Sequence, residues 1–119
     1  EKRLNIAFQY SKFCKILSSQ GFIVIIATIS MFEEIYNWNR ENLPGYFEVY
    51  LKVPIEELVR RDSKRIYSKF SKGLIKNVAG LDLKIDEPTN ADIVFNFDPT
   101  KSVDELAEAL VGKADLNSL

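Results

Sequence analysis

A continuous apolar run at residues 22–29 constrains the fold more than any other feature of this sequence. Only Thr28 interrupts it, and residues 22–27 (Phe-Ile-Val-Ile-Ile-Ala) are rich in β-branched side chains. A strand with one face in water alternates apolar and polar residues. This run does not alternate, so both of its faces should be covered. It is too short to span a bilayer. It therefore predicts a buried strand of a parallel sheet with helices on both sides.

Helical and strand-like patterns alternate along the rest of the chain. A helix before Gly21 is predicted by one stripe of side chains at three- and four-residue spacings: Leu4, Ala7, Phe8, Ser11, Cys14 and Leu17. Further helices are predicted at residues 31–42, 54–61 and 63–72, and strands at 46–53 and 93–97. Residues 74–92 are predicted to be mainly loop. The order predicts an α/β fold with a parallel sheet flanked by helices and three strands in this chain.

The last helix has the clearest start signal. Ser102-Val-Asp-Glu105 has the pattern of a capping box, and Val103, Leu106 and Leu110 are predicted to face the core. We expect one domain at residues 1–113 with a core of its own, followed by a short tail at 114–119.

Composition excludes several kinds of chemistry. The chain has no histidine, which removes imidazole bases, His-based metal sites and Ser-His or Cys-His pairs. Cys14 is the only cysteine, so no intrachain disulfide can form. A single thiol within an apolar pattern, with no signal-peptide pattern, predicts a cytoplasmic protein. We expect no membrane partner.

A cationic segment lies between residues 60 and 76. Its basic residues are Arg60, Arg61, Lys64, Arg65, Lys69, Lys72 and Lys76, and its only acid is Asp62. On a chain with a net charge of -1, this segment suits a polyanion such as a nucleoside triphosphate. A solvated helix face is the alternative. A nucleic-acid surface is not expected, because the overall balance is not basic.

Two other groups of residues are candidates for chemistry. Ser30 follows the predicted first strand, where parallel sheets bind ligands, although a serine there can also be a helix cap. Asp82, Asp86, Glu87 and Asp92 could offer oxygen ligands to magnesium. Their spacing matches no metal loop, so we predict a solvated loop and no metal site.

Several motifs, taken in order, resemble the adenylylsulfate kinase family. Residues 21–32 resemble its strand and I-S-P-F turn, and residues 47–55 resemble its next strand and helix start. Arg61-Asp-Ser-Lys-Arg-Ile-Tyr67 resembles the lid motif R-D-P-K-G-L-Y, and residues 73–82 resemble G-E-I-K-G-F-T-G-I-D. Asp86-Glu-Pro88 follows at the right distance. The resemblance covers about residues 1–112.

The resemblance implies a partial P-loop kinase fold that transfers the γ-phosphoryl group of ATP, with Mg2+, to the 3′-hydroxyl of adenylyl sulfate. It assigns Arg61 and Lys64 to a lid over ATP, and Ser30 to an active-site position. It assigns the acceptor contacts to Arg3, Ile29, Arg40 and Lys76. No G-x-x-x-x-G-K-[ST] occurs in this sequence, so we expect the family's first strand and phosphate loop to precede Glu1. Such a chain would be inactive alone, with an exposed sheet edge that favours self-association, for example as a homodimer.

Departures from the family pattern leave the acceptor open. Val78 and Ala79 replace a Phe-Thr pair whose ring stacks on adenine in the family, Arg65 replaces a lid glycine, and Tyr36 stands where an arginine is common. One alternative is therefore a kinase for another small hydroxylated acceptor. The other is a non-catalytic nucleotide-binding or regulatory module of the same fold.

Overall fold

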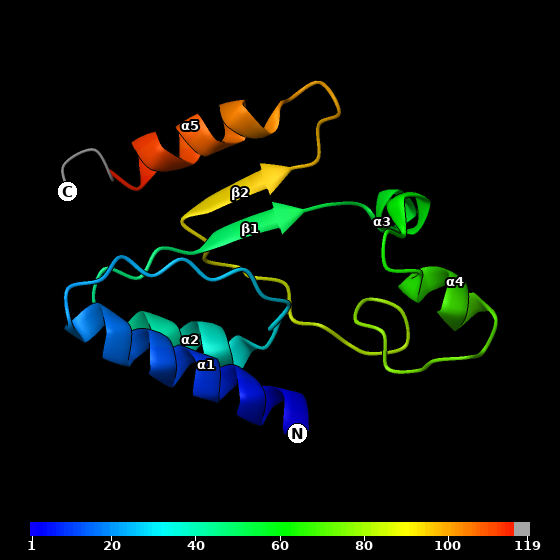
Figure 1. Ribbon diagram of the computed structural model, residues 1–119, viewed down its shortest axis with the longest axis horizontal. Helices are drawn as coiled ribbons and strands as arrows, with labels where there is room; N and C mark the ends of the chain where they lie inside the picture. The colour runs from blue at the N-terminus through cyan, green and yellow to red at the C-terminus, as the bar shows by residue number, and fades with distance from the viewer. Residues whose placement is uncertain (116–119) are drawn as a thin grey trace. The chain divides into compact units, whose positions relative to one another are not determined.

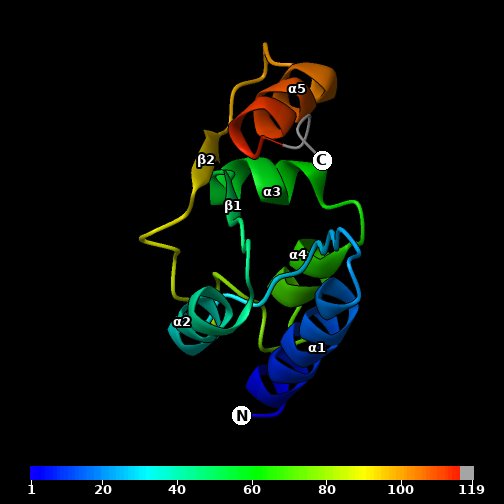
Figure 2. The same cartoon turned by 90° about the vertical axis from the view of Figure 1, so that its left-hand side faces the viewer.

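The computed structural model describes residues 1–115 and contains helices, short strands and long connections (Figures 1 and 2). The elements in chain order are α1 (Lys2–Ser19), α2 (Glu33–Asn42), β1 (Val49–Lys52), α3 (Ile55–Arg61), α4 (Ile66–Ser71), β2 (Ile93–Asn96) and α5 (Val103–Lys113). They form two compact units. The first comprises Glu1–Tyr46 and Ile85–Thr89, and the second comprises Phe47–Lys84 and Asn90–Leu119.

The first unit is a helical pair in which α1 and α2 lie side by side (Figure 1). Small side chains on α1, Ala7 and Ser11, are buried, as the helical stripe predicted. Ile35 is the buried residue of α2. The rings of Phe8 and Trp38 meet edge to face with their centroids 6.2 Å apart, which joins the two helices with a favourable aromatic geometry. Gly21, at φ 86°, ends the helical path.

The second unit is built on a parallel pair of strands. β1 and β2 pair in register from Val49 opposite Ile93 to Lys52 opposite Asn96. Before the strands begin, the Glu48 N–H donates to the Asp92 carboxylate at 2.7 Å, and the Asp92 N–H donates to the Glu48 carbonyl at 2.9 Å. Helix α5 packs against β2 and begins with the predicted capping box. The α/β class with a parallel sheet flanked by helices is confirmed.

The predicted strand at residues 22–27 is wrong, and the described sheet has two strands rather than three. The run is instead an extended connection after α1, and Phe22, Ile25 and Ile29 are 64%, 88% and 79% exposed. A strand exists only where a neighbouring strand accepts and donates its backbone hydrogen bonds. Within residues 1–115, the sheet consists of β1 paired with β2.

The described residues bury few apolar side chains. Among the described residues, the buried apolar side chains are Ala7, Ile35 and Val78, and no large side chain is fully buried. Val103 was predicted to face the core but is 80% exposed, whereas Leu106 and Leu110 are half-buried. Val103 lies in the first turn of α5, while Leu106 and Ala109 line the groove beside β2. The domain at 1–113 stays a prediction, and residues 116–119 of its tail lie outside the described residues.

Candidate active site

The predicted site residues are divided between the two units. Arg3, Ile29, Ser30 and Arg40 belong to the first, and Arg61, Lys64 and Lys76 belong to the second. The two groups are therefore described separately, and every one of these assignments stays a prediction. No helix among residues 1–115 is long and apolar enough to cross a membrane.

Ser30 lies in the extended connection that leads into α2. Its hydroxyl is 2.8 Å from the Thr28 hydroxyl, and its carbonyl accepts from the Phe32 N–H at 3.0 Å. Ser30 is half-buried, and its neighbour Ile29 is exposed. A hydroxyl partner can share a hydrogen bond but does not take up a proton at neutral pH. The contact orients Ser30 without activating it as a nucleophile.

Arg40 and Arg3 are the cations of the first unit that were predicted to contact the acceptor. Arg40 lies in the last turn of α2, and its guanidinium carbon is 5.0 Å from the centroid of the Tyr46 ring. Stacking of this kind uses the face of a guanidinium, while anion binding uses its edge, so one arginine can do both. Arg3 is exposed on the first turn of α1.

The loop at residues 85–89 is fixed to the start of α2 by Asp86. The Asp86 N–H donates to the Met31 carbonyl at 3.1 Å, and the Asp86 carboxylate accepts from the Glu33 N–H at 3.3 Å. The Tyr36 hydroxyl donates to the Asp86 carbonyl at 2.8 Å. Tyr36 therefore helps to hold this loop. The sequence showed only that Tyr36 stands where an arginine is common in the family.

Three of the four carboxylates of the predicted solvated loop accept backbone N–H groups, and Asp82 and Glu87 are exposed as predicted. Asp86 and Asp92 accept backbone N–H groups as described above. Asp82 accepts from the N–H groups of Asn77 and Val78 at 2.9 and 2.7 Å. These contacts close a tight loop, and the Asn77 N–H bond is the main reason that the pKa of Asp82 lies below its usual range. Spacing alone could not show this, because the donors are backbone groups brought near by turns.

Val78 is one of the few buried side chains, with 9% of its surface exposed. It lies inside the loop that Asp82 closes, and Lys76 precedes that loop with its side chain exposed. The backbone at Asn77 is left-handed, with φ 61°. The position at which the family resemblance places an adenine-stacking ring is thus occupied by a small, buried aliphatic side chain.

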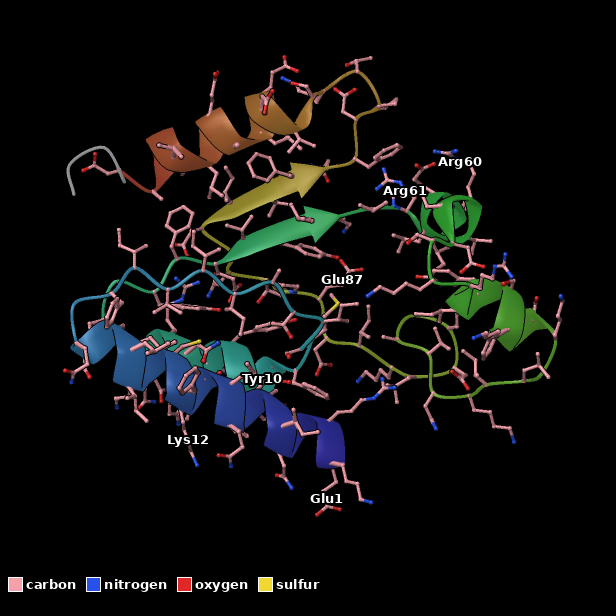
Figure 3. All side chains as sticks on the ribbon, in the orientation of Figure 1. Glu1, Tyr10, Lys12, Arg60, Arg61 and Glu87 are labelled. Carbon is pink, nitrogen blue, oxygen red and sulfur yellow. The ribbon has the colours of Figure 1, made fainter. Side chains whose placement is uncertain are left out.

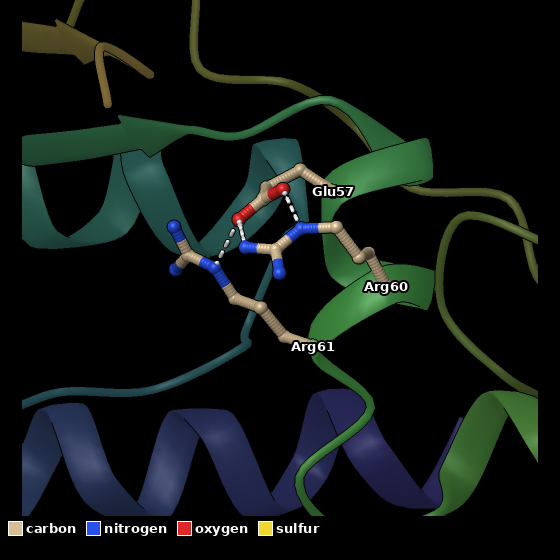
Figure 4. A network of polar contacts seen from close by, with 3 residues as sticks. All are labelled: Glu57, Arg60 and Arg61. Carbon is tan, nitrogen blue, oxygen red and sulfur yellow. Dashed lines mark hydrogen bonds and ion pairs between the residues drawn. The ribbon is translucent and has the colours of Figure 1, made fainter. Parts of the chain in front are cut away.

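The lid segment consists of α3, α4 and the turn between them. Glu57 on α3 binds both arginines at the end of that helix (Figure 4). The Arg61 guanidinium carbon lies 5.2 Å from the centroid of the Phe97 ring. Asp62 caps α4 by accepting from the N–H groups of Tyr67 and Ser68, both at 2.9 Å. Lys64 is exposed in the intervening turn.

Arg65 occupies the position of the lid glycine and has a left-handed backbone, with φ 52°. A side chain in this conformation costs about 1–2 kcal/mol relative to the right-handed region, whereas glycine adopts it freely. The lid turn therefore keeps the geometry for which a glycine is suited, and the residue present makes it less favourable.

Comparison with known proteins decides the family. The sequence profile described as adenylylsulphate kinase matches residues 1–96. The chain belongs to the adenylylsulfate kinase family. The resemblance predicted from the motifs is confirmed, and the arrangement of the elements agrees with it. The adenylylsulfate (APS) kinase of Mycobacterium tuberculosis, solved with AMPPNP and APS, matches with a TM-score of 0.85 and 26% identity, over 95% of this chain and 66% of that one. The fold is that of a P-loop kinase.

Curated relatives within the adenylylsulfate kinase family carry two different names. The cytidine diphosphoramidate kinase of Campylobacter jejuni is 40% identical over 114 residues, covering 96% of this chain and 66% of the relative. The probable adenylyl-sulfate kinase of Archaeoglobus fulgidus is 35% identical over 82 residues, covering 69% of this chain and 53% of the relative. The adenylyl-sulfate kinase of a Picosynechococcus strain is 32% identical over 95 residues, covering 80% and 51%. The chain thus spans between about half and two thirds of the length of these relatives.

Proposed function

We propose that the full-length gene product containing this chain transfers the γ-phosphoryl group of ATP to a ribose hydroxyl of a nucleotide-derived acceptor. Membership of the adenylylsulfate kinase family supports the reaction type. The named acceptors of the relatives are cytidine diphosphoramidate and adenylyl sulfate, both of which are nucleotides with a modified phosphate. We place cytidine diphosphoramidate first and adenylyl sulfate second.

The observation that carries the choice of acceptor is the buried Val78. A purine ring gains stacking energy from an aromatic platform. Val78 has no ring, and only 9% of its surface is exposed to contact a base. The loop around it is closed by the Asp82 carboxylate, so the side chain is not positioned to turn outward without breaking two backbone contacts. A kinase that does not rely on an adenine platform fits this loop. The relative that acts on a cytidine compound is also the one with 40% identity.

The cationic residues predicted for the site fall into two groups, one for ATP and one for the acceptor. Arg61 and Lys64 would lie over the ATP phosphates, where cations stabilise the charge of the transferring group. Arg3, Arg40 and Lys76 would bind the phosphate portion of the acceptor. Ile29 and Ser30 would line the pocket beside the reacting hydroxyl.

Magnesium ions in such reactions are held largely by phosphate oxygens and water, with one or two carboxylates. Asp62 and Asp82 already accept backbone N–H groups, and no cluster of three metal-ligating residues occurs among residues 1–115. The Mg2+ expected with ATP would therefore be held mainly by the phosphate oxygens and by water. ATP itself supplies the phosphoryl group. A cytoplasmic location and a homodimer remain predictions.

The test is a product assay on the full-length gene product with γ-labelled ATP and four acceptors: cytidine diphosphoramidate, CDP, adenylyl sulfate and AMP. We expect label on a ribose hydroxyl of the first acceptor, with kcat/KM at least about tenfold above that for adenylyl sulfate, the range that one lost or gained pocket contact provides. A preference for adenylyl sulfate would reverse the order of acceptors. Binding of AMPPNP with no transfer to any acceptor would favour the regulatory module.

A further inference from the structure

Glu57 joins the two arginines at the end of α3 through three hydrogen bonds of equal length. Its carboxylate accepts from Nε and Nη2 of Arg60 and from Nε of Arg61, each at 2.7 Å (Figure 4). The Glu57 side chain is only 12% exposed, compared with 72% for Arg60 and 49% for Arg61. The carboxylate is thus enclosed by the two guanidinium groups.

The local sequence explains this arrangement. Glu57 lies in the first turn of α3, and the arginines follow three and four residues later, which places all three side chains on neighbouring positions of the helix surface. A glutamate before an arginine at these spacings is the favourable order, because the acid lies near the positive end of the helix and the bases near the negative end.

The two arginines are held in different ways. Arg60 makes a bidentate contact that uses two of its nitrogens on Glu57. Arg61 uses only Nε on Glu57, and its guanidinium carbon lies over the Phe97 ring, 5.2 Å from the centroid. Figure 4 shows the terminal nitrogens of Arg61 pointing away from the carboxylate. Two contacts therefore restrain this guanidinium, the hydrogen bond from Nε and the contact with the Phe97 ring, and they leave its terminal nitrogens pointing away from Glu57.

Net charge supports a role toward an anion. One carboxylate shared by two guanidinium groups leaves the cluster with a positive charge, so Glu57 restrains Arg61 without cancelling the cation that a nucleotide would meet. All three residues and Phe97 belong to the second unit, so the arrangement lies within one compact unit.

We propose that Glu57 is a positioning residue of the lid: it holds the Arg61 guanidinium on Phe97 with its terminal nitrogens presented to bound nucleotide. This inference rests on the proposed function, in which Arg61 contacts ATP. An arginine that is already oriented loses less side-chain freedom when the nucleotide binds, so loss of Glu57 should weaken nucleotide binding rather than slow the chemical step.

The experiment compares Glu57→Ala, Glu57→Gln and Glu56→Ala in the full-length gene product. Glu57→Ala should raise KM for ATP about 5- to 10-fold, while kcat and KM for the acceptor stay within about twofold. Glu57→Gln keeps an oxygen that accepts from Nε, so it should raise KM for ATP only about 2- to 4-fold. Glu56→Ala is the matched control, because it removes the same negative charge from the exposed neighbouring position of α3 and leaves the Glu57 network in place, and it should stay within about twofold.

A second readout does not depend on catalysis. The Nε–H signal of Arg61 in a 15N NMR spectrum should be shifted and slow to exchange in the wild type and in Glu56→Ala, and should lose both properties in Glu57→Ala. If no acceptor is phosphorylated by the wild type, the proposed function fails, and the change in AMPPNP affinity together with the NMR signal decides the positioning role. An unchanged or lower KM for ATP in an active Glu57→Ala variant would overturn the inference, as would an unaltered Nε–H signal.

Discussion

Residues 22–27 and residues 93–97 have similar strand-forming sequences but different structures. The first segment, Phe-Ile-Val-Ile-Ile-Ala, is the more apolar and the richer in β-branched residues, yet it forms no strand. The second, Ile-Val-Phe-Asn-Phe, contains the strand β2. Strand propensity ranks them in the wrong order. The difference shows that a strand is determined by its partner and only permitted by its sequence.

The partner of β2 is specified by contacts on either side of the pairing. Asp92 and Glu48 exchange hydrogen bonds at the entry to the strands, and the Phe97 N–H donates to the Lys52 carbonyl at 2.9 Å at the exit. These contacts set the register of β1 against β2. The run at 22–27 makes one contact of this kind at its start, from the Phe22 N–H back to the Leu17 carbonyl at 3.4 Å, which continues the end of α1 rather than a sheet.

The largest difference in stability between the two segments is expected when a proline is placed in each. The N–H groups of Ile93 and Phe97 point to β1, so the N–H of Phe95, two residues from each, points the same way. Phe95→Pro removes that donor and leaves an acceptor unpaired, so it should destabilise the 119-residue chain by about 2–3 kcal/mol. Ile25→Pro should cost under about 1 kcal/mol. Urea unfolding followed by circular dichroism measures both.

Alanine at the same positions is the control for this pair. Phe95→Ala and Ile25→Ala remove the side chains without removing the N–H, so the proline-minus-alanine difference isolates the backbone bond. Amide hydrogen exchange should agree, with residues 22–27 exchanging faster than residues 93–97. An equal proline cost in the two segments would show that residues 22–27 are paired after all.

A smaller effect on stability is expected at the start of α5, whose capping box forms between residues close together in the chain. The Ser102 hydroxyl accepts from the Glu105 N–H at 3.2 Å, and the Glu105 carboxylate accepts from the Ser102 N–H at 2.7 Å. Ser102→Ala should cost about 1 kcal/mol, because it removes half of the capping box of α5. Ser18→Ala is the control, since that half-buried serine lies inside α1 and its hydroxyl donates to the Lys15 carbonyl rather than capping the start of a helix. Equal unfolding free energies for the two variants would contradict the role of the cap.

The smallest effect expected is a local response of α3 to acid. Hydrogen bonds from Arg60, and then from Arg61, lower the pKa of Glu57 from 4.5 to about 2. Because the pKa is lower in the folded protein, the stabilisation from this group is complete above pH 4.5 and is lost as the pH falls toward 2. The 13C signal of the Glu57 carboxyl should titrate near pH 2.

Arginine variants test which hydrogen bond contributes more to the lowered pKa of Glu57. Arg60→Ala should move the titration of Glu57 upward by more than Arg61→Ala, because the bond to Arg60 is the larger cause. A midpoint near 4.5 in the wild type would mean that the three-residue network of Figure 4 does not form in solution.

The burial and hydrogen bonding of several side chains outside the short motifs could not be predicted from the sequence. Figure 3 shows side chains projecting from the ribbon. The exposure of charged residues such as Lys12 and Arg60 can be predicted from their residue type. The burial of Val78 was not predicted, nor was the role of Asp82, Asp86 and Asp92 as backbone acceptors. Each depends on a turn that brings an N–H group several residues away to the carboxylate, and no spacing rule encodes such turns.

The sequence by itself determined the helices and their order, the capping box of Ser102 and the family, because these depend on residues close together in the chain or on motifs in a fixed order. Only the tertiary structure decided which apolar segments pair as strands, which carboxylates bind the backbone, and that Glu57 and Phe97 together orient Arg61. Those outcomes depend on groups distant in the chain whose hydrogen bonds and contacts form only when the fold brings them within a few ångströms.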